Sequence, residues 1–181
     1  MKYLDHSKVT KYIALEPNQF MHDEIRDKAL PFGYAESDGS MIILTTGAEN
    51  ISSIISSIGV HSVDTMICIM TLCSIPSAEE TLKSLVRDIL KPGGQILFYE
   101  HVKSPRKDVA WWQRFWTPLW SAIMDGCDLA RPTHVWIENM VQIDQTGESI
   151  SMWREGETWR NEGESGAETL FPHQSGRFVK V

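Results

Sequence analysis

Four short apolar runs, each followed by a turn and a segment of helical periodicity, constrain the fold of this chain more than any other feature of its sequence. The runs lie at residues 12–15, 41–44, 63–70 and 95–100. Apolar residues at helical spacing between them predict helices over 19–30, 51–58 and 77–89. The run at 63–70 is apolar almost throughout, which suits a parallel strand covered on both faces. The alternation therefore predicts an α/β fold with a Rossmann-like, doubly wound and mostly parallel sheet.

Turn residues mark the predicted ends of these helices. Asn18 is a suitable cap for the first helix, and the segment 31–33, Pro-Phe-Gly, ends it. Ser77 followed by Glu80 has the spacing of a capping box, and the segment 91–94, Lys-Pro-Gly-Gly, ends the helix that begins there. Two later segments, 149–153 and 177–181, are predicted to be the closing strands of the sheet, the last of them antiparallel.

Length and charge limit the classes of protein to which the chain can belong. With 181 residues it has the size of a single domain, predicted to span residues 1–181. The net charge of −7 argues against nucleic acid as a partner, and no apolar run approaches the ~18 residues of a transmembrane segment. The cysteines, Cys68, Cys73 and Cys127, form no CxxC pair, so we expect neither a disulfide framework nor a zinc site. Cys68 and Cys73 lie in an apolar run and are expected to be buried structural thiols. A reducing, cytoplasmic location is the corresponding expectation.

Polar or loop residues follow three of the predicted strands at the point where each strand ends. Glu16 follows the first strand, Ala48 and Glu49 follow the second, and the segment 70–73 follows the third. Ligands of open α/β sheets bind outside the carboxyl ends of the strands. A carboxylate such as that of Glu16 can accept both hydroxyl protons of a ribose, although a lone acid at a strand end is more often simply solvated.

Several longer segments, taken with these strand ends, resemble the class I S-adenosylmethionine-dependent methyltransferases, and within them the methyltransferase-like thiol S-methyltransferase group. The segments are SVDTMICIMTLCSI (62–75), LKPGGQILFYEHV (90–102), DGC (125–127) and FPHQSGRFVK (171–180). The resemblance implies that Glu16 holds the ribose hydroxyls and that Ala48 and Glu49 lie beside the adenine. It also implies that Met70, Thr71 and Leu72 run under the methionine part of S-adenosylmethionine.

Candidates for the chemical step are less sharply defined, because methyl transfer mostly requires the acceptor to be positioned. His101 follows a strand end and is the first candidate for a base, while Asp125 and His173 are candidates from the family-like segments. Each of the three also has an ordinary structural interpretation as a capping or loop residue. A thiol acceptor needs little help, since a thiol with a pKa near 8.5 is partly ionised at neutral pH.

The segment WWQRFWTPLW (111–120) places Trp112, Trp116 and Trp120 on one helical face. Such a stripe is commonly part of the core, and the functional alternative is an apolar wall of the acceptor pocket. Basic residues beside the tryptophans also suit contact with a membrane surface, which is the weakest of the three interpretations.

The chain departs from the family pattern at its start. The family's first strand and its glycine-rich loop would precede Met1, so we expect an N-terminally truncated domain that binds S-adenosylmethionine weakly or not at all. Strand edges left open in this way favour association into a homo-oligomer. The predicted function is methylation of a small, largely apolar thiol or hydroxyl compound. The alternative is a methyltransferase-derived protein that no longer methylates and acts as an isomerase, a cyclase or a binding partner.

Overall fold

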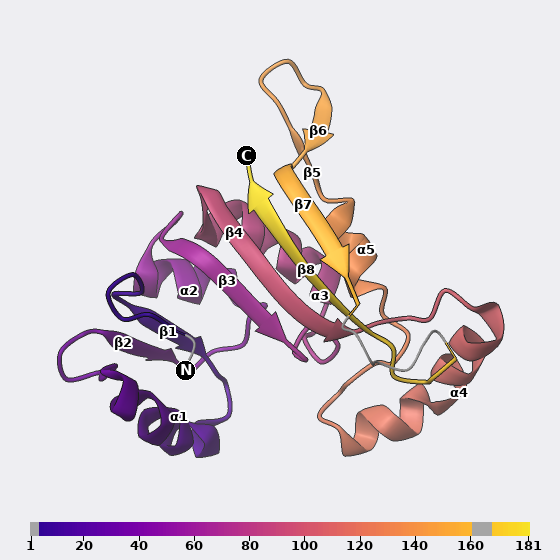
Figure 1. The fold of residues 1–181 in the computed structure, drawn as a ribbon, viewed down its shortest axis with the longest axis horizontal. Helices are drawn as coiled ribbons and strands as arrows, with labels where there is room; N and C mark the ends of the chain where they lie inside the picture. The colour runs from indigo at the N-terminus through magenta and orange to yellow at the C-terminus, as the bar shows by residue number, and fades with distance from the viewer. Residues whose placement is uncertain (1–3, 161–167) are drawn as a thin grey trace. The chain divides into compact units, whose positions relative to one another are not determined.

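The structure is a computed structural model, and it describes residues 4–160 and 168–181. The chain divides into two compact units, residues 1–58 and 59–181, which are described separately below (Figure 1). The prediction that residues 1–181 form a single domain stays a prediction.

The first unit is built on two parallel strands, β1 (Tyr12–Leu15) and β2 (Met41–Leu44). Between them lie α1 (His22–Ala29) and single 3-10 turns over Gln19–Met21 and Leu30–Phe32, and α2 (Ile51–Ile58) follows β2. Asn18 accepts a hydrogen bond from the backbone N–H of Phe20, and Gly33 adopts a φ of 82° beyond the last turn. Both predicted end signals of this helical segment are therefore confirmed.

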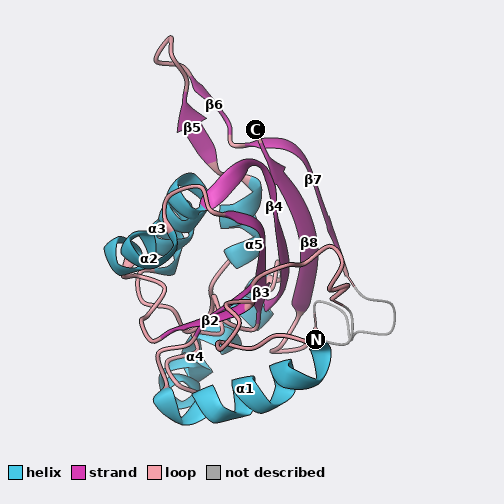
Figure 2. Ribbon diagram, turned by 90° about the vertical axis from the view of Figure 1, so that its left-hand side faces the viewer, coloured by secondary structure: helices cyan, strands magenta, loops and turns pink. Residues whose placement is uncertain are grey.

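The second unit contains a four-stranded sheet in the order β3–β4–β8–β7. The strands are β3 (Val63–Ile69), β4 (Leu90–His101), β7 (Trp153–Trp159) and β8 (His173–Lys180). Strand β3 runs parallel to β4, whereas β8 is antiparallel to both β4 and β7. One face of this sheet is covered by α3 (Ala78–Ser84), which continues as a π-helical turn over Leu85–Ile89, and by α5 (Thr133–Glu138) (Figure 2). The core between them includes Leu82, Val86, Ile96, Ile137 and Phe178.

Two further elements of the second unit lie outside this sheet. Helix α4 (Lys107–Ile123) carries the tryptophan-rich segment, with Pro118 inside it. Strands β5 (Val141–Ile143) and β6 (Ser149–Ser151) form a separate antiparallel hairpin. In the part of the chain that the structure describes, no helix has both the length and the apolar character needed to cross a membrane.

Three predictions about individual elements were wrong in part. Ser77 has a left-handed backbone, with φ 44°, and its side chain caps no helical N–H, because a side-chain cap requires an extended backbone at that position. Most of the segment 149–153 lies outside the main sheet. Ser149–Ser151 forms β6 of the hairpin, and Trp153 begins β7, the strand next to β8. The final strand is antiparallel as predicted, but it begins at His173 rather than near Arg177.

The α/β class with parallel strand pairs and an antiparallel last strand is confirmed, but the strands form separate sheets. We expected strands 12–15 and 63–70 to belong to one sheet, whereas β1 pairs with β2 and β3 pairs with β4 in separate sheets. Within the described residues, both β1 and β3 have one edge without a paired strand.

Candidate functional site

The carboxyl ends of β1 and β2 bring three predicted cofactor residues to one edge of the first unit. The N–H of Glu16 donates to the carbonyl of Leu44 at 3.0 Å, so Glu16 continues the pairing of the two strands. Its Oε1 accepts a hydrogen bond from the N–H of Asn18 at 2.8 Å. Ala48 is buried, and the carboxylate of Glu49 lies where a side chain at position 47 would stand, which explains the glycine there.

The loop that follows β3 is held by a buried carboxylate from the neighbouring strand. Oε1 of Glu100 accepts hydrogen bonds from the N–H of Thr71 at 2.9 Å and from the N–H of Leu72 at 3.1 Å. The Thr71 hydroxyl donates to the same oxygen at 3.3 Å. Met70, at the start of the loop, has a left-handed backbone with φ 52°. Two of the three predicted cofactor residues of the second unit, Thr71 and Leu72, are therefore fixed by Glu100.

Glu100 was not predicted as a site residue, although it is the most deeply buried acid of the site. Its exposed fraction is 0%, and within the described part of the chain its Oε2 has no hydrogen-bond partner. Burial raises the pKa of this carboxyl above its usual range, and the hydrogen bonds from Thr71 and Leu72 oppose the shift. In the sequence, Glu100 is an acid at the end of an apolar strand. Sequence alone does not distinguish a buried acid in this position from one that faces solvent.

Arg131 holds the same loop from the other side. Its Nη1 donates to the carbonyl of Leu72 at 2.9 Å and to the carbonyl of Ile75 at 2.7 Å. The N–H of Asp128 donates to the carbonyl of Cys73 at 3.0 Å. The segment after α4 is thus tied directly to the loop after β3, and this link was not predicted from the sequence.

The three candidate bases lie in different environments. His101 is buried, with an exposed fraction of 2%, and burial lowers the pKa of its imidazole. His173 stands opposite His101 on the neighbouring strand, and its ring stacks on Tyr99 with 5.0 Å between the centroids. Asp125 is exposed in the turn after α4, with φ 46°. The structure therefore brings the two histidines together on one face of the sheet, and Asp125 lies on a separate segment.

Two of the three predicted substrate tryptophans line one apolar pocket of about 200 Å³. Trp116 and Trp120 form its wall together with Phe171, whose ring centroid lies 4.8 Å from that of Trp120. Trp112 does not line this pocket and packs instead on its neighbours in α4. Because Trp112 and Trp116 are 47% and 41% exposed, their assignment to the core is wrong.

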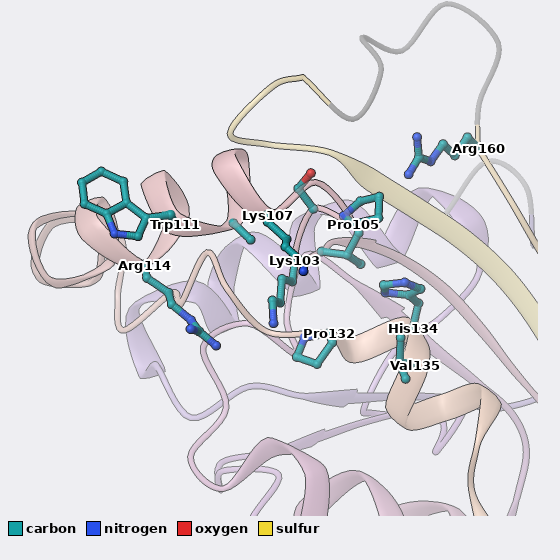
Figure 3. A pocket seen from close by; sticks show the side chains of 12 residues that line it. Lys103, Pro105, Lys107, Trp111, Arg114, Pro132, His134, Val135 and Arg160 are labelled. Atoms are coloured by element: carbon teal, nitrogen blue, oxygen red, sulfur yellow. The ribbon is translucent and has the colours of Figure 1, made fainter.

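A second, wider pocket of about 600 Å³ has a basic lining (Figure 3). Lys103 precedes α4, Lys107 and Arg114 belong to it, His134 comes from α5, and Arg160 follows β7. Among the described residues that line this pocket, none is acidic. Its positive charge suits an anionic group.

Curated relatives of known activity match part of the chain. Thiol S-methyltransferase TMT1B of Rattus norvegicus is 44% identical over 73 residues, which are 40% of this chain and 30% of that protein. TMT1B and TMT1A of Homo sapiens are 42% and 38% identical over 79 and 74 residues. The chain thus spans about a third of the length of the curated relatives it matches. No protein-family model matches it.

Solved methyltransferase structures share the fold over nearly the whole chain. The CurJ carbon methyltransferase has a TM-score of 0.62 at 17% identity, covering 99% of this chain and 44% of that one. A geranyl diphosphate methyltransferase in complex with SAM has a TM-score of 0.61 at 10% identity, covering 97% and 71%. A SAM-dependent methyltransferase of Thermotoga maritima, TM1293, has a TM-score of 0.57 at 16% identity, covering 92% and 72%.

Proposed function

The fold of this chain is that of the class I S-adenosylmethionine-dependent methyltransferase superfamily, and from this premise we propose that it methylates a small, largely apolar thiol or hydroxyl compound. The observation that carries the proposal is that, in each unit taken by itself, predicted cofactor residues stand at the carboxyl ends of strands. Glu16, Ala48 and Glu49 share the carboxyl edge of β1 and β2, and Thr71 and Leu72 are fixed at the carboxyl end of β3. This is where ligands bind in open α/β sheets.

The first unit is suited to the nucleoside part of the cofactor. One carboxylate oxygen of Glu16 orients the side chain by accepting from Asn18, and the other makes no hydrogen bond to a described residue. The side chain is thus held in place with acceptor capacity left for the ribose hydroxyls. We assign Ala48 and Glu49 to the adenine, and Met70, Thr71 and Leu72 to the methionine part. S-adenosylmethionine supplies a methyl group on an activated sulfonium.

The pocket of Trp116 and Trp120 is the proposed acceptor site. Its volume of about 200 Å³ and its apolar lining suit a small uncharged molecule. Leu129 lines this pocket. The residue before it, Asp128, donates a backbone hydrogen bond to the carbonyl of Cys73 at the end of the loop after β3. A thiolate of the acceptor attacks the methyl carbon, the sulfonium carbon–sulfur bond breaks, and the thiol proton has already been released to solvent. A thiol acceptor needs no protein base, because an ordinary thiol is partly ionised near neutral pH.

We propose further that the isolated 181-residue chain binds the cofactor weakly. No glycine precedes Gly33 in its sequence, so these residues provide no glycine turn before Glu16. In related folds such a turn lets the backbone approach the cofactor closely. Loss of about three hydrogen bonds to charged groups, at ~1.5 kcal/mol each, lowers affinity by a factor on the order of 10³. The second candidate is a methyltransferase-derived protein that retains the pocket without methylating.

Calorimetric titration of the chain with S-adenosylmethionine and S-adenosylhomocysteine tests both statements. We expect weak binding that Glu16→Ala abolishes and that Glu24→Ala, a change of an exposed acid on α1, leaves intact. Methyl transfer is measured separately, with a labelled methyl group and a panel of small thiols and alcohols. Micromolar binding would contradict the expected weak affinity but not the methyltransferase proposal. No binding at millimolar cofactor by the folded chain would overturn the methyltransferase proposal and favour the second candidate.

A further inference from the structure

Three buried side chains with metal-binding atoms meet in the second unit, and they come from three separate segments. Cys73 lies in the loop after β3, His101 is the last residue of β4, and Cys127 lies in the turn after α4. Their exposed fractions are 2%, 2% and 8%. One ligand atom of each lies within 4.8 Å of the ligand atoms of the other two. The fold has thus gathered two thiols and an imidazole away from solvent.

The spacing of these atoms is close to that of a tetrahedral metal site. With Zn–S bonds of about 2.3 Å and Zn–N bonds of about 2.0 Å, neighbouring ligand atoms are roughly 3.5 to 3.8 Å apart. Sγ of Cys127 already lies 3.8 Å from Nδ1 of His101. The remaining distances, at most 4.8 Å, need to shorten by at most roughly 1.3 Å. The backbone bond from Asp128 to Cys73 holds the two cysteine-bearing segments together.

The imidazole of His101 is only partly satisfied by the residues around it. Its Nδ1 faces Sγ of Cys127 at 3.8 Å. Its Nε2 is buried and has no hydrogen-bond partner within the described part of the chain. A buried polar atom without a partner is rare in proteins and points to a group that the described residues do not supply.

We propose that Cys73, His101 and Cys127 bind one Zn²⁺ ion, with water in the fourth position. On binding, the two thiols lose their protons to solvent and become thiolates, which with a neutral imidazole are the ligands that zinc prefers. The proposal replaces the role of base predicted for His101, and it departs from the expectation, drawn from cysteine spacing, that no metal site is present. The site joins the ends of β3 and β4 to the turn after α4, and so stabilises the cofactor loop.

The test is zinc binding by the full chain, purified under reducing conditions and freed of metal by a chelator. We expect one equivalent of Zn²⁺ to bind, measured by competition with a chromophoric chelator, and Co²⁺ to give thiolate charge-transfer and tetrahedral d–d bands. Cys73→Ser, Cys127→Ser and His101→Gln should each lower the affinity by at least about 100-fold, since loss of an outer-shell partner alone costs 10- to 100-fold. Cys68→Ser is the matched control, because Cys68 is also buried but lies outside the cluster.

Wild-type stoichiometry decides the question even where a variant fails to fold. Absence of zinc binding by the folded wild-type chain would overturn the proposal. So would equal loss of affinity in Cys68→Ser, since that would place the metal elsewhere. Mass spectrometry showing a Cys73–Cys127 disulfide in the chain purified without reductant, together with no zinc binding after reduction, would assign the two thiols to redox chemistry instead.

Discussion

Replacing Glu100 with alanine is expected to release the loop after β3 and to destabilise the second unit. The change removes the oxygen that accepts from the N–H groups of Thr71 and Leu72 and from the Thr71 hydroxyl. The hydroxyl can turn to another acceptor, but the two backbone N–H groups cannot. Thr71 and Leu72 then lose the hydrogen bonds that tie them to Glu100 of β4.

The expected magnitude follows from the two N–H groups. A buried donor left without a partner costs about 1 to 3 kcal/mol, so the pair costs roughly 2 to 6 kcal/mol. Relief of the buried charge, which burial already disfavours in Glu100, offsets part of this. We therefore expect the free energy of unfolding to fall by about 2 to 4 kcal/mol. Glu100→Gln keeps an acceptor oxygen of the same reach and should stay within about 1 kcal/mol of wild type.

Urea unfolding followed by circular dichroism gives the two free energies, and amide hydrogen exchange locates the effect. In Glu100→Ala the amides of Thr71 and Leu72 should lose protection, whereas in Glu100→Gln they should keep it. Unchanged protection at both amides in the alanine variant would refute the reasoning. Equal destabilisation by alanine and glutamine would also refute it, because the lost acceptor could then not be the cause.

Three further predictions concern the acceptor pocket, the open edge of the sheet and a buried thiol. Trp116→Ala should reduce acceptor methylation at least about tenfold while changing the unfolding free energy by less than ~1 kcal/mol, since Trp116 is 41% exposed; equal effects from Trp112→Ala, outside the pocket, would contradict the assignment. Among the described residues no strand pairs with one edge of β3, and Ile67 and Ile69 are 52% and 59% exposed, so we expect the chain to self-associate and Ile67→Lys to shift sedimentation toward the monomer. A wild-type monomer at all concentrations would count against this. Burial, and secondarily the charge of Glu100, raises the pKa of Cys68 from 9.0 to about 12, so the folded thiol stays protonated where the unfolded one ionises, and stability falls by about 1.4 kcal/mol per pH unit above pH 9. The free energy of unfolding of Cys68→Ala, measured by urea titration, should fall less steeply between pH 9 and 11 than that of wild type. Identical slopes would show that the pKa of Cys68 is not raised.

The elements that sequence predicted best are those set by local pattern. Strands β1 and β2 begin and end where the apolar runs do, and α2 coincides with its predicted range 51–58. Asn18 and Gly33 act as predicted, because a cap and a left-handed turn depend on neighbouring residues only. The start of β8 was missed, since His173 to Gly176 is polar and becomes a strand through its ladders with β4 and β7.

By itself, the sequence determined the α/β class, the order of strands and helices, and the placement of Glu16 and the 70–72 loop at strand ends, because these depend on the period of apolar residues and on turn chemistry. Tertiary structure alone decided the burial of Glu100 and the exposure of Trp116, because burial depends on which distant segments cover a side chain. It also decided that Cys73, His101 and Cys127 meet, since their spacing along the chain has no metal-binding pattern and the fold brings three separate segments together. Residues that meet only through long-range packing have no periodic pattern in the sequence, so the chemistry of their contacts can be inferred only once the fold is known.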